Sequence, residues 1–226
     1  FYQTVSDYGK AKYYLLRAIK IDPHHASSLA ELGKITFIQG LMDEADEYYR
    51  QAMEYDGEDL LIVRSYCEYL ANRLRHREAL AIWTKVQEKH PDNVLVKAGL
   101  AVHFSLTMQQ DKAAELYSQL VEEHPDNPDY LVRWSAMEEK RHQVDVAIDL
   151  ARCAIGLEPE LITARLALAR ALSRDKQYDE ALAELAAIDK DKLQQEPQAV
   201  QADNPIIVCG KWSERRSTGV CLSYLW

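Results

Sequence analysis

The tetrapeptide His-Pro-Asp-Asn occurs twice, at residues 90–93 and 124–127. We call the distance in sequence between the two copies, from residue 90 to residue 124, the period. Turn-forming residues occur at the same period along most of the chain: Pro23, Gly57, Pro91, Pro125 and Pro159. Self-similarity at one fixed period is the signature of a repeat array. We therefore interpret the tetrapeptide as the boundary between successive repeats and not as a chemical site.

Three further series of residues keep the same period. One contains only alanine: Ala11, Ala45, Ala79, Ala113, Ala147 and Ala181. A second contains only small residues: Gly33, Cys67, Ala101, Ser135 and Ala169. A third contains large apolar residues: Leu32, Tyr66, Leu100, Trp134 and Leu168. Small side chains let two helix backbones approach closely, and a larger residue placed there would overpack the crossing.

Each period divides into two segments with a helical pattern. In residues 60–72 and 76–89, apolar side chains recur three or four positions apart, which is the spacing of a helix face. Residues 73–75 form the break between the two segments. Proline at the end of a period disfavours helical angles in the residue before it, and the Asp and Asn that follow can cap the next helix. The sequence predicts an all-α array of helix pairs.

The charge balance restricts the partners of this chain. Its 226 residues include 27 Lys and Arg against 36 Asp and Glu, which gives a formal net charge of −9. Nucleic acid and anionic membranes are bound through basic surfaces, so we expect neither partner, although a local basic strip is compatible with this balance. No apolar run approaches the roughly 18 residues of a membrane-spanning helix.

Cysteines and histidines show no catalytic or metal-binding pattern. Cys67, Cys153, Cys209 and Cys221 lack CxxC spacing and have no His cluster beside them. We interpret them as unpaired, mostly buried thiols, which favour a reducing compartment. We therefore expect the cytoplasm, with the periplasm as the alternative. The sequence motifs of nucleotide-binding loops, serine hydrolases and zinc proteases are absent. We predict no catalytic residue, no cofactor and no metal.

Residues 26–59, ASSLAELGKITFIQGLMDEADEYYRQAMEYDGED, resemble the tetratricopeptide repeat (TPR) family. The matching positions are Leu29, Leu32, Gly33, Gly40, Glu44, Ala45, Tyr49 and Ala52. By this resemblance residues 1–25 are the rear part of a preceding repeat, so we expect a fragment of a longer chain, and further repeats cover 60–93, 94–127, 128–161 and 162–188. Lys97 and Arg165 depart from a position that is usually apolar.

The resemblance implies a TPR solenoid of about five and a half repeats, wound as a right-handed superhelix. In the family, the first helices line a concave groove that binds a peptide or extended segment of a partner protein. The groove positions of this chain are Lys34, Phe37, Arg64, Glu68, Asn72, Leu95, Val102, Leu106, Arg133, Lys140, Arg170 and Arg174. Glu139 is a further inward-facing position. We therefore expect a non-enzymatic scaffold. The oligomeric state has no signature in the sequence.

The composition of these positions predicts the chemistry of the partner. Leu95, Val102 and Leu106 form an apolar centre, and arginines gather toward the C-terminal end. Arginine grips carboxylates and phosphates in bidentate fashion, so we expect an apolar anchor with acidic or phosphorylated flanks. The alternative is that Arg170 and Arg174 form a solvated face and that the apolar patch packs against the next turn or a neighbouring chain. If the arginines point into the concave surface, their reversal to Glu should leave the fold nearly unchanged.

One known mode of partner binding fits poorly. Chaperone-binding members of the family hold a C-terminal carboxylate through Lys and Asn residues on successive first helices. The matching positions in this chain are Ala30, Lys34, Ser65, Leu95 and Gly99, and only Lys34 is basic. We therefore expect no chaperone-tail binding.

Residues 189–226 do not follow the repeat pattern. A polar linker, 189–204, precedes the apolar run 206–209, and residues 216–219 are faintly similar to the phosphosulfate-binding loop of sulfotransferases. We interpret this tail as a linker with a capping segment or the start of another domain. An alternative function is the recruiting region of a group-transfer enzyme of the sulfotransferase or glycosyltransferase type. A second alternative, suggested by RWSAMEEKR at residues 133–141, is a half-a-TPR scaffold of RNA processing.

Overall fold

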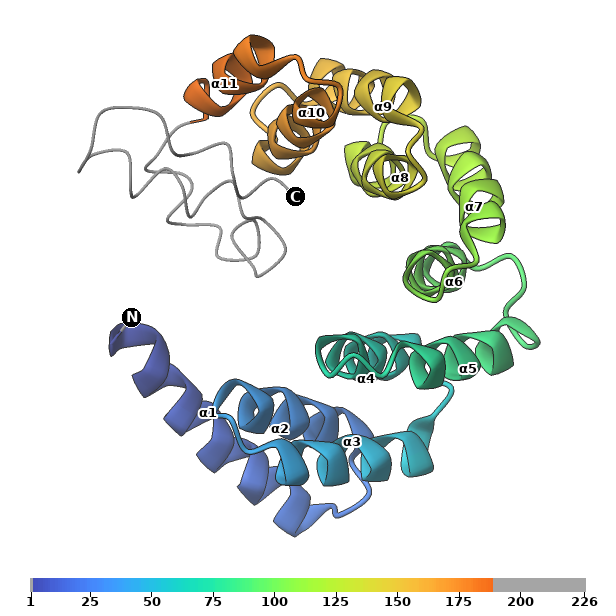
Figure 1. Cartoon of the computed structure of the whole chain (residues 1–226). Helices are drawn as coiled ribbons and strands as arrows, with labels where there is room; N and C mark the ends of the chain where they lie inside the picture. The colour runs from blue at the N-terminus through green and yellow to red at the C-terminus, as the bar shows by residue number, and fades with distance from the viewer. Residues whose placement is uncertain (1, 189–226) are drawn as a thin grey trace. The chain divides into compact units, whose positions relative to one another are not determined.

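The computed structural model describes residues 2–188, and within this range the chain forms eleven α-helices and no strand (Figure 1). In chain order they are α1 (Tyr2–Ile21), α2 (Ala26–Ile38), α3 (Met42–Asp56), α4 (Leu60–Asn72), α5 (His76–Gln87), α6 (Val94–Leu106), α7 (Gln110–Glu123), α8 (Pro128–Lys140), α9 (Val144–Leu157), α10 (Ile162–Arg174) and α11 (Tyr178–Ala186). The all-α architecture is confirmed. The tail at 189–226, with its candidate loop, lies outside the described residues.

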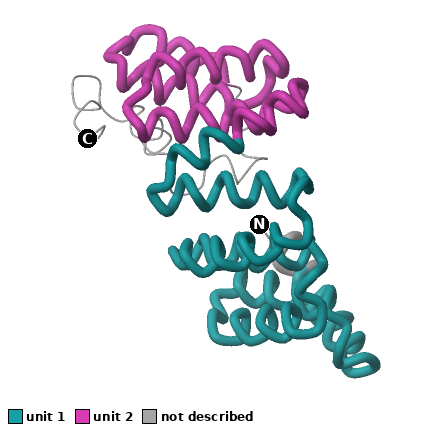
Figure 2. The backbone as a smooth tube through the Cα atoms, turned by 90° about the vertical axis from the view of Figure 1, so that its right-hand side faces the viewer, with its two compact units in different colours: residues 1–116 teal, residues 117–226 magenta. Residues whose placement is uncertain are grey.

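The even-numbered helices from α2 to α10 begin at residues 26, 60, 94, 128 and 162, so successive first helices start one period apart. Each is followed, after a short turn, by a second helix. The chain divides into two units, residues 1–116 and 117–226, and the division falls within α7 (Figure 2). The two units are described separately below.

The asparagines of the repeated tetrapeptide cap first helices. The Asn93 side chain accepts hydrogen bonds from the backbone N–H groups of Leu95, at 2.9 Å, and Val96, at 3.4 Å. The Asn127 side chain accepts one from the N–H of Asp129 at 3.1 Å. These bonds satisfy amide groups that have no partner inside their own helix. The tetrapeptide is therefore a helix boundary, as its spacing predicted.

The two small-residue series face each other inside the repeats. The Cys67 thiol of α4 donates a hydrogen bond to the carbonyl of Ala79 in α5, at 3.7 Å. At the equivalent position in unit 2, the Ser135 hydroxyl of α8 donates a hydrogen bond to the carbonyl of Ala147 in α9, at 2.7 Å. All four residues are buried. The period in the sequence therefore records where the first and second helices of a repeat cross.

The turns within repeats share an unusual backbone conformation. Five residues, each one period after the last, have positive φ angles: Gly40 at 80°, Leu74 at 58°, Met108 at 65°, His142 at 62° and Lys176 at 63°. This left-handed region suits glycine, because any other side chain meets the backbone there. Four of the five turns therefore carry local strain.

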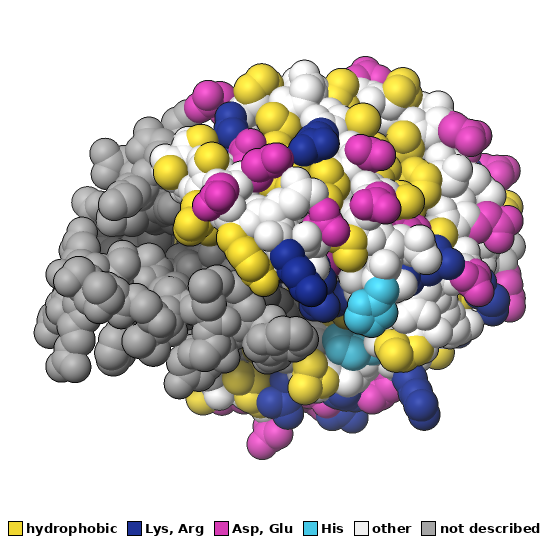
Figure 3. Space-filling model, turned by 45° about the horizontal axis from the view of Figure 1, so that its top comes forward, with side chains coloured by type: hydrophobic (Ala, Val, Ile, Leu, Met, Phe, Trp, Pro, Cys, Tyr) yellow, Lys and Arg dark blue, Asp and Glu magenta, His cyan; other side chains and the backbone are white. Residues whose placement is uncertain are grey.

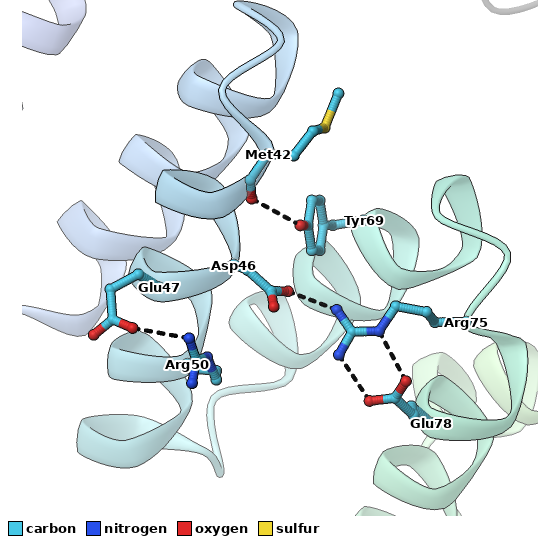
Figure 4. Close-up of polar contacts among 7 residues, drawn as sticks. All are labelled: Met42, Asp46, Glu47, Arg50, Tyr69, Arg75 and Glu78. Atoms are coloured by element: carbon cyan, nitrogen blue, oxygen red, sulfur yellow. Dashed lines mark hydrogen bonds and ion pairs between the residues drawn. The ribbon is translucent and has the colours of Figure 1, made fainter.

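Aromatic side chains fill much of the interior of unit 1. The rings of Tyr49, Tyr66 and Tyr69 lie 5.0–6.1 Å apart, and Phe37 meets Tyr69 edge to face at 5.3 Å. The hydroxyls remain paired: Tyr69 donates to the carbonyl of Met42 at 3.2 Å (Figure 4), and Tyr49 lies 3.0 Å from the Ser65 hydroxyl. Burial raises the pKa of Tyr49 to about 12, so this phenol stays neutral.

Alanines and short aliphatic residues fill the interior of unit 2. The largest cluster there joins α9, α10 and α11 through Ala147, Ile148, Ala151, Ala167, Leu168, Ala169, Ala171, Leu172 and Ala181. Two acidic residues of α8, Glu138 and Glu139, are buried in the same unit. Unit 2 thus combines close helix contacts with charged groups away from water.

Candidate functional site

First helices are neighbours within each unit, so their side chains can form a shared surface. In unit 1, α4 contacts both α2 and α6, and in unit 2, α8 contacts α10. The predicted groove residues therefore form two sets, which we call the first-helix face of unit 1 and the first-helix face of unit 2. The unit 1 face contains Lys34, Phe37, Arg64, Glu68, Asn72, Leu95, Val102 and Leu106; the unit 2 face contains Arg133, Lys140, Arg170 and Arg174.

The polar members of the unit 1 face are exposed. Lys34 of α2 and Arg64, Glu68 and Asn72 of α4 all point to solvent. Arg64 Nε lies 3.7 Å from Glu68 Oε1, and both side chains are more than half exposed. Exposed ion pairs of this kind contribute about 0–1 kcal/mol, so a partner can replace the contact at little cost.

The apolar members of this face are half-buried. Phe37 and Leu95 pack against the core of unit 1, while one side of each stays accessible. Val102 and Leu106 lie one helical turn apart on α6, and they share its face with Leu95. The unit 1 face therefore has an apolar stripe on α6 next to the exposed charges of α4.

The unit 2 face differs from the prediction in its arginines. Arg133 and Lys140 are exposed on α8. Arg170 and Arg174 instead reach from α10 to α8, where their Nε atoms each lie 2.5 Å from a carboxylate oxygen of Glu139. The Glu139 side chain is only 4% exposed. Arg170 and Arg174 thus pair with a buried carboxylate, although Arg174 itself stays half exposed. From this contact we expect their reversal to Glu to destabilise the fold, in contrast to the prediction from the sequence.

A second buried carboxylate occupies the same helix. Glu138 accepts hydrogen bonds from Trp134 Nε1 at 2.9 Å and from Arg141 Nη1 at 3.1 Å. The stretch RWSAMEEKR, which suggested an RNA-processing scaffold, therefore uses its Trp and both of its Glu side chains inside the fold. The sequence contained a signal for the Glu139 cluster, because Arg170 and Arg174 follow Glu139 at close to one period.

At the positions where chaperone-binding members of the family hold a carboxylate, several residues of this chain have a packing role instead. Ala30 is buried, and Ser65 bonds with Tyr49. A Cβ atom added at Gly99 would lie 2.3 Å from the Trp83 ring. These positions support the interior of unit 1, and Lys34 is the basic residue among them.

The described residues contain no group of three or more His, Cys, Asp or Glu side chains placed to hold a metal ion. Burial raises the pKa of the Cys67 thiol to about 12, which makes this cysteine a poor nucleophile. Cys153 is free and exposed, while Cys209 and Cys221 lie outside the described residues. Arg165, which departs from the family pattern, bonds with Glu184 at 2.8 Å.

The surface is of mixed charge. On the face drawn in Figure 3, acidic and basic side chains are interspersed with apolar ones. No helix in residues 2–188 has the length and apolarity needed to cross a bilayer.

Comparisons with solved structures identify the fold. The chain is similar to PilW, a type IV pilus biogenesis factor, with a TM-score of 0.70 and 17% identity over 92% of this chain and 93% of that one. For PilF of Pseudomonas aeruginosa the TM-score is 0.62, with 18% identity over 95% and 93% of the two chains. For MamA of Desulfovibrio magneticus RS-1 it is 0.56, with 16% identity over 78% and 97%.

Sequence comparisons agree with the fold. No curated protein matches this chain. Two family models, both described as tetratricopeptide repeat, match residues 26–59 and 100–127. The regular period, the paired helices and these matches lead to one assignment: residues 26–59 and 100–127 are tetratricopeptide repeats, and the same helix pairs recur through the described residues 2–188.

Proposed function

We propose that this chain is a protein-interaction scaffold that binds an extended segment of a partner along its first helices. The observation that supports this proposal most directly is the stripe of Leu95, Val102 and Leu106 on α6. These side chains are half-buried, whereas Lys34, Arg64, Glu68 and Asn72 on the neighbouring first helices of unit 1 are exposed polar groups. An apolar stripe beside charged residues is the composition of a binding surface, with an apolar centre and a polar rim.

The charges beside the stripe indicate the partner's chemistry. Lys34 and Arg64 are exposed basic residues on neighbouring helices of unit 1. In the unit 2 face Arg133 and Lys140 are exposed, and Arg174 is half exposed. Arg170 and Arg174 are engaged with Glu139. We therefore assign the partner an apolar anchor for α6 and acidic or phosphorylated residues for Lys34 and Arg64.

A peptide selection tests this proposal. Phage displaying random peptides are selected on the full chain, and the affinity of a selected peptide is measured by fluorescence anisotropy. Val102→Ser should weaken binding about tenfold by removing one apolar contact. Lys34→Glu with Arg64→Glu should also weaken peptide binding, and the loss of affinity should grow as the salt concentration falls. At low salt the reversed charges repel the acidic flanks of the peptide most strongly.

The matched control is Arg50→Glu with Lys85→Glu, which makes the same charge change on the second helices α3 and α5. It should leave the affinity unchanged. Equal losses from both pairs would show that only net charge matters, and selected peptides that are insensitive to Val102→Ser would place the binding surface elsewhere. Either outcome contradicts the proposal.

We place the protein in a reducing compartment, and Cys153 supports this, because an exposed free thiol is readily oxidised outside one. The likeness to PilW, a pilus biogenesis factor, makes the periplasm the competing location. Mapping the oxidation state of Cys153 in cells by alkylation distinguishes the two.

A further inference from the structure

Two turns of unit 1 border a surface cavity that is separate from most of the first-helix face. The cavity measures about 470 Å³ and is lined by residues 74–78, which begin in the α4–α5 turn, and by residues 106–108 of the α6–α7 turn. This volume lies in the range of pockets that accept a ligand group. We call this region the turn edge.

The turn edge exposes two large apolar side chains at strained positions. Leu74 is 80% exposed and Met108 is 79% exposed. Both have positive φ angles, of 58° and 65°. At the equivalent position, one period before Leu74, the chain has Gly40, which adopts this conformation without strain. Neither the backbone conformation nor the exposure of Leu74 and Met108 favours folding, which points to a role outside the fold.

The same turn concentrates positive charge in an acidic chain. Residues 73–77 read Arg-Leu-Arg-His-Arg. Arg75 is neutralised: its guanidinium lies 2.7 Å from Asp46 of α3 and makes two bonds of 2.8 Å with Glu78 of α5 (Figure 4). This contact anchors the turn to α3. Arg73 and Arg77 are exposed, and neither makes an ion pair with another described residue.

We propose that the turn edge is a second interaction surface, which binds an acidic peptide segment that carries a large apolar side chain. The apolar side chain enters the cavity between Leu74 and Met108, and carboxylates on either side of it pair with Arg73 and Arg77. Arg75 also lines the cavity, but its charge is neutralised by Asp46 and Glu78, so its role is to hold the turn in place. The charge of the turn is complementary to this segment and opposite to that of the whole chain.

A protein segment fits the turn edge better than a membrane surface. A cavity accommodates a single protruding side chain, whereas a bilayer presents a broad anionic plane. Two unpaired arginines provide little attraction to such a plane, and a chain with a formal net charge of −9 is repelled by it. Anionic vesicles therefore serve as the competing probe in the test.

The test measures binding of a fluorescein-labelled peptide with one leucine flanked by three glutamates on each side, by anisotropy with the full chain. The double variant Leu74→Gly with Met108→Gly removes both apolar side chains and relieves both strained turns. It should bind the peptide at least about tenfold more weakly while its Tm equals or exceeds that of the wild type. Arg73→Glu with Arg77→Glu should also reduce binding at least about tenfold.

The matched control is His142→Gly with Lys176→Gly, which relieves the equivalent turns of unit 2 and should leave peptide affinity unchanged. Three results would each overturn the proposal. The first is that the wild type fails to bind the peptide. The second is that the Leu74→Gly, Met108→Gly variant binds the peptide as tightly as the wild type. The third is that this variant melts at a lower temperature than the wild type, which would make the two side chains part of the fold. Binding to vesicles of phosphatidylcholine and phosphatidylserine in place of the peptide would also reject it, in favour of a membrane.

Discussion

Units 1 and 2 repeat the same helix pairs at the same period, yet their interiors are filled in different ways. Unit 1 packs Tyr49, Tyr66, Tyr69 and Trp83 around the crossings of its helices. Unit 2 places alanines and leucines at its helix contacts and buries Glu138 and Glu139 of α8, whose carboxylates pair with more exposed arginines. The small-residue series continue through both.

This difference separates what the repeat requires from what it allows. The required part is a small residue on each helix where the pair crosses, as at Cys67 with Ala79 and at Ser135 with Ala147. The rest of the interior can be filled by aromatic rings or by ion pairs. The two fillings should respond differently to mutation, because a ring loses packing whereas a buried charge loses its compensation.

The largest expected effect concerns the ion cluster of unit 2. Arg170→Ala with Arg174→Ala should lower the free energy of unfolding by about 3–5 kcal/mol, because the buried carboxylate of Glu139 is left without a partner. Equilibrium urea unfolding followed by circular dichroism measures the change. Adding Glu139→Leu to the pair should recover most of the loss, since it removes the uncompensated charge.

Arg152→Ala is the control for that comparison. Arg152 and Glu180 form an ion pair in the same unit at 3.3 Å, with both side chains more than half exposed. Its loss should cost less than about 1 kcal/mol. Similar losses for Arg152→Ala and for Arg170→Ala with Arg174→Ala would show that the Glu139 carboxylate is solvated in solution.

The second effect concerns pH and unit 1. His103 of α6 is buried, its Nδ1 atom has no hydrogen-bond partner, and burial together with the nearby His76 lowers its pKa from 6.5 to about 4. Because the unfolded chain binds the proton more tightly, this site does not oppose folding above pH 6.5. Its destabilisation grows as the pH falls toward 4, and reaches about 2–3 kcal/mol by pH 4.5.

Urea unfolding at pH 7 and pH 4.5 measures this linkage, with His103→Leu as the comparison. The variant keeps an apolar side chain of similar size and lacks the titrating group, so it should lose about 2–3 kcal/mol less than the wild type over this interval. An equal pH dependence of both proteins would show that His103 does not titrate in this range.

The third effect compares a glycine in each unit. Gly99 of α6 lies against Trp83, and a Cβ atom there would approach the ring to 2.3 Å. Gly99→Ala should therefore destabilise the protein by about 1–3 kcal/mol despite the higher helix propensity of alanine. Gly156 of α9 has nothing within 4 Å of the same position, so Gly156→Ala should stabilise by up to about 1 kcal/mol. Thermal and urea unfolding of both variants distinguish these signs.

The fold was predictable because it depends on local and repeated signals. The spacing of Asn93 and Asn127 predicted the helix boundaries, and the alanine series located the crossings. The alanine series recurs once in every period, so a misleading residue at one position is corrected by its equivalents elsewhere. Lys97 and Arg165 illustrate this, since neither departure from the pattern disturbs its helix.

The candidate site was harder to predict because exposure depends on neighbours that a single residue does not reveal. Arg170 and Arg174 have the composition of a solvated face, and only the position of Glu139 on the adjacent first helix shows that they are engaged. The strained turns were missed for a related reason. Gly40 alone has the residue type that indicates positive φ, whereas the four equivalents are Leu, Met, His and Lys.

The smallest expected effect concerns these turns and sharpens the comparison between the units. His142→Gly and Lys176→Gly in unit 2 should each raise the free energy of unfolding by about 0.5–1 kcal/mol, because glycine relieves the left-handed strain at some cost in chain entropy. Gly40→Ala in unit 1 should lower it by a similar amount: its Cβ meets nothing within 4 Å, so the φ angle of 80° is the whole cause. Urea midpoints measured in parallel for the three variants test the sign. Lower stability for both unit 2 glycines would mean that His142 and Lys176 hold their turns through side-chain contacts, and the strain would then be compensated locally.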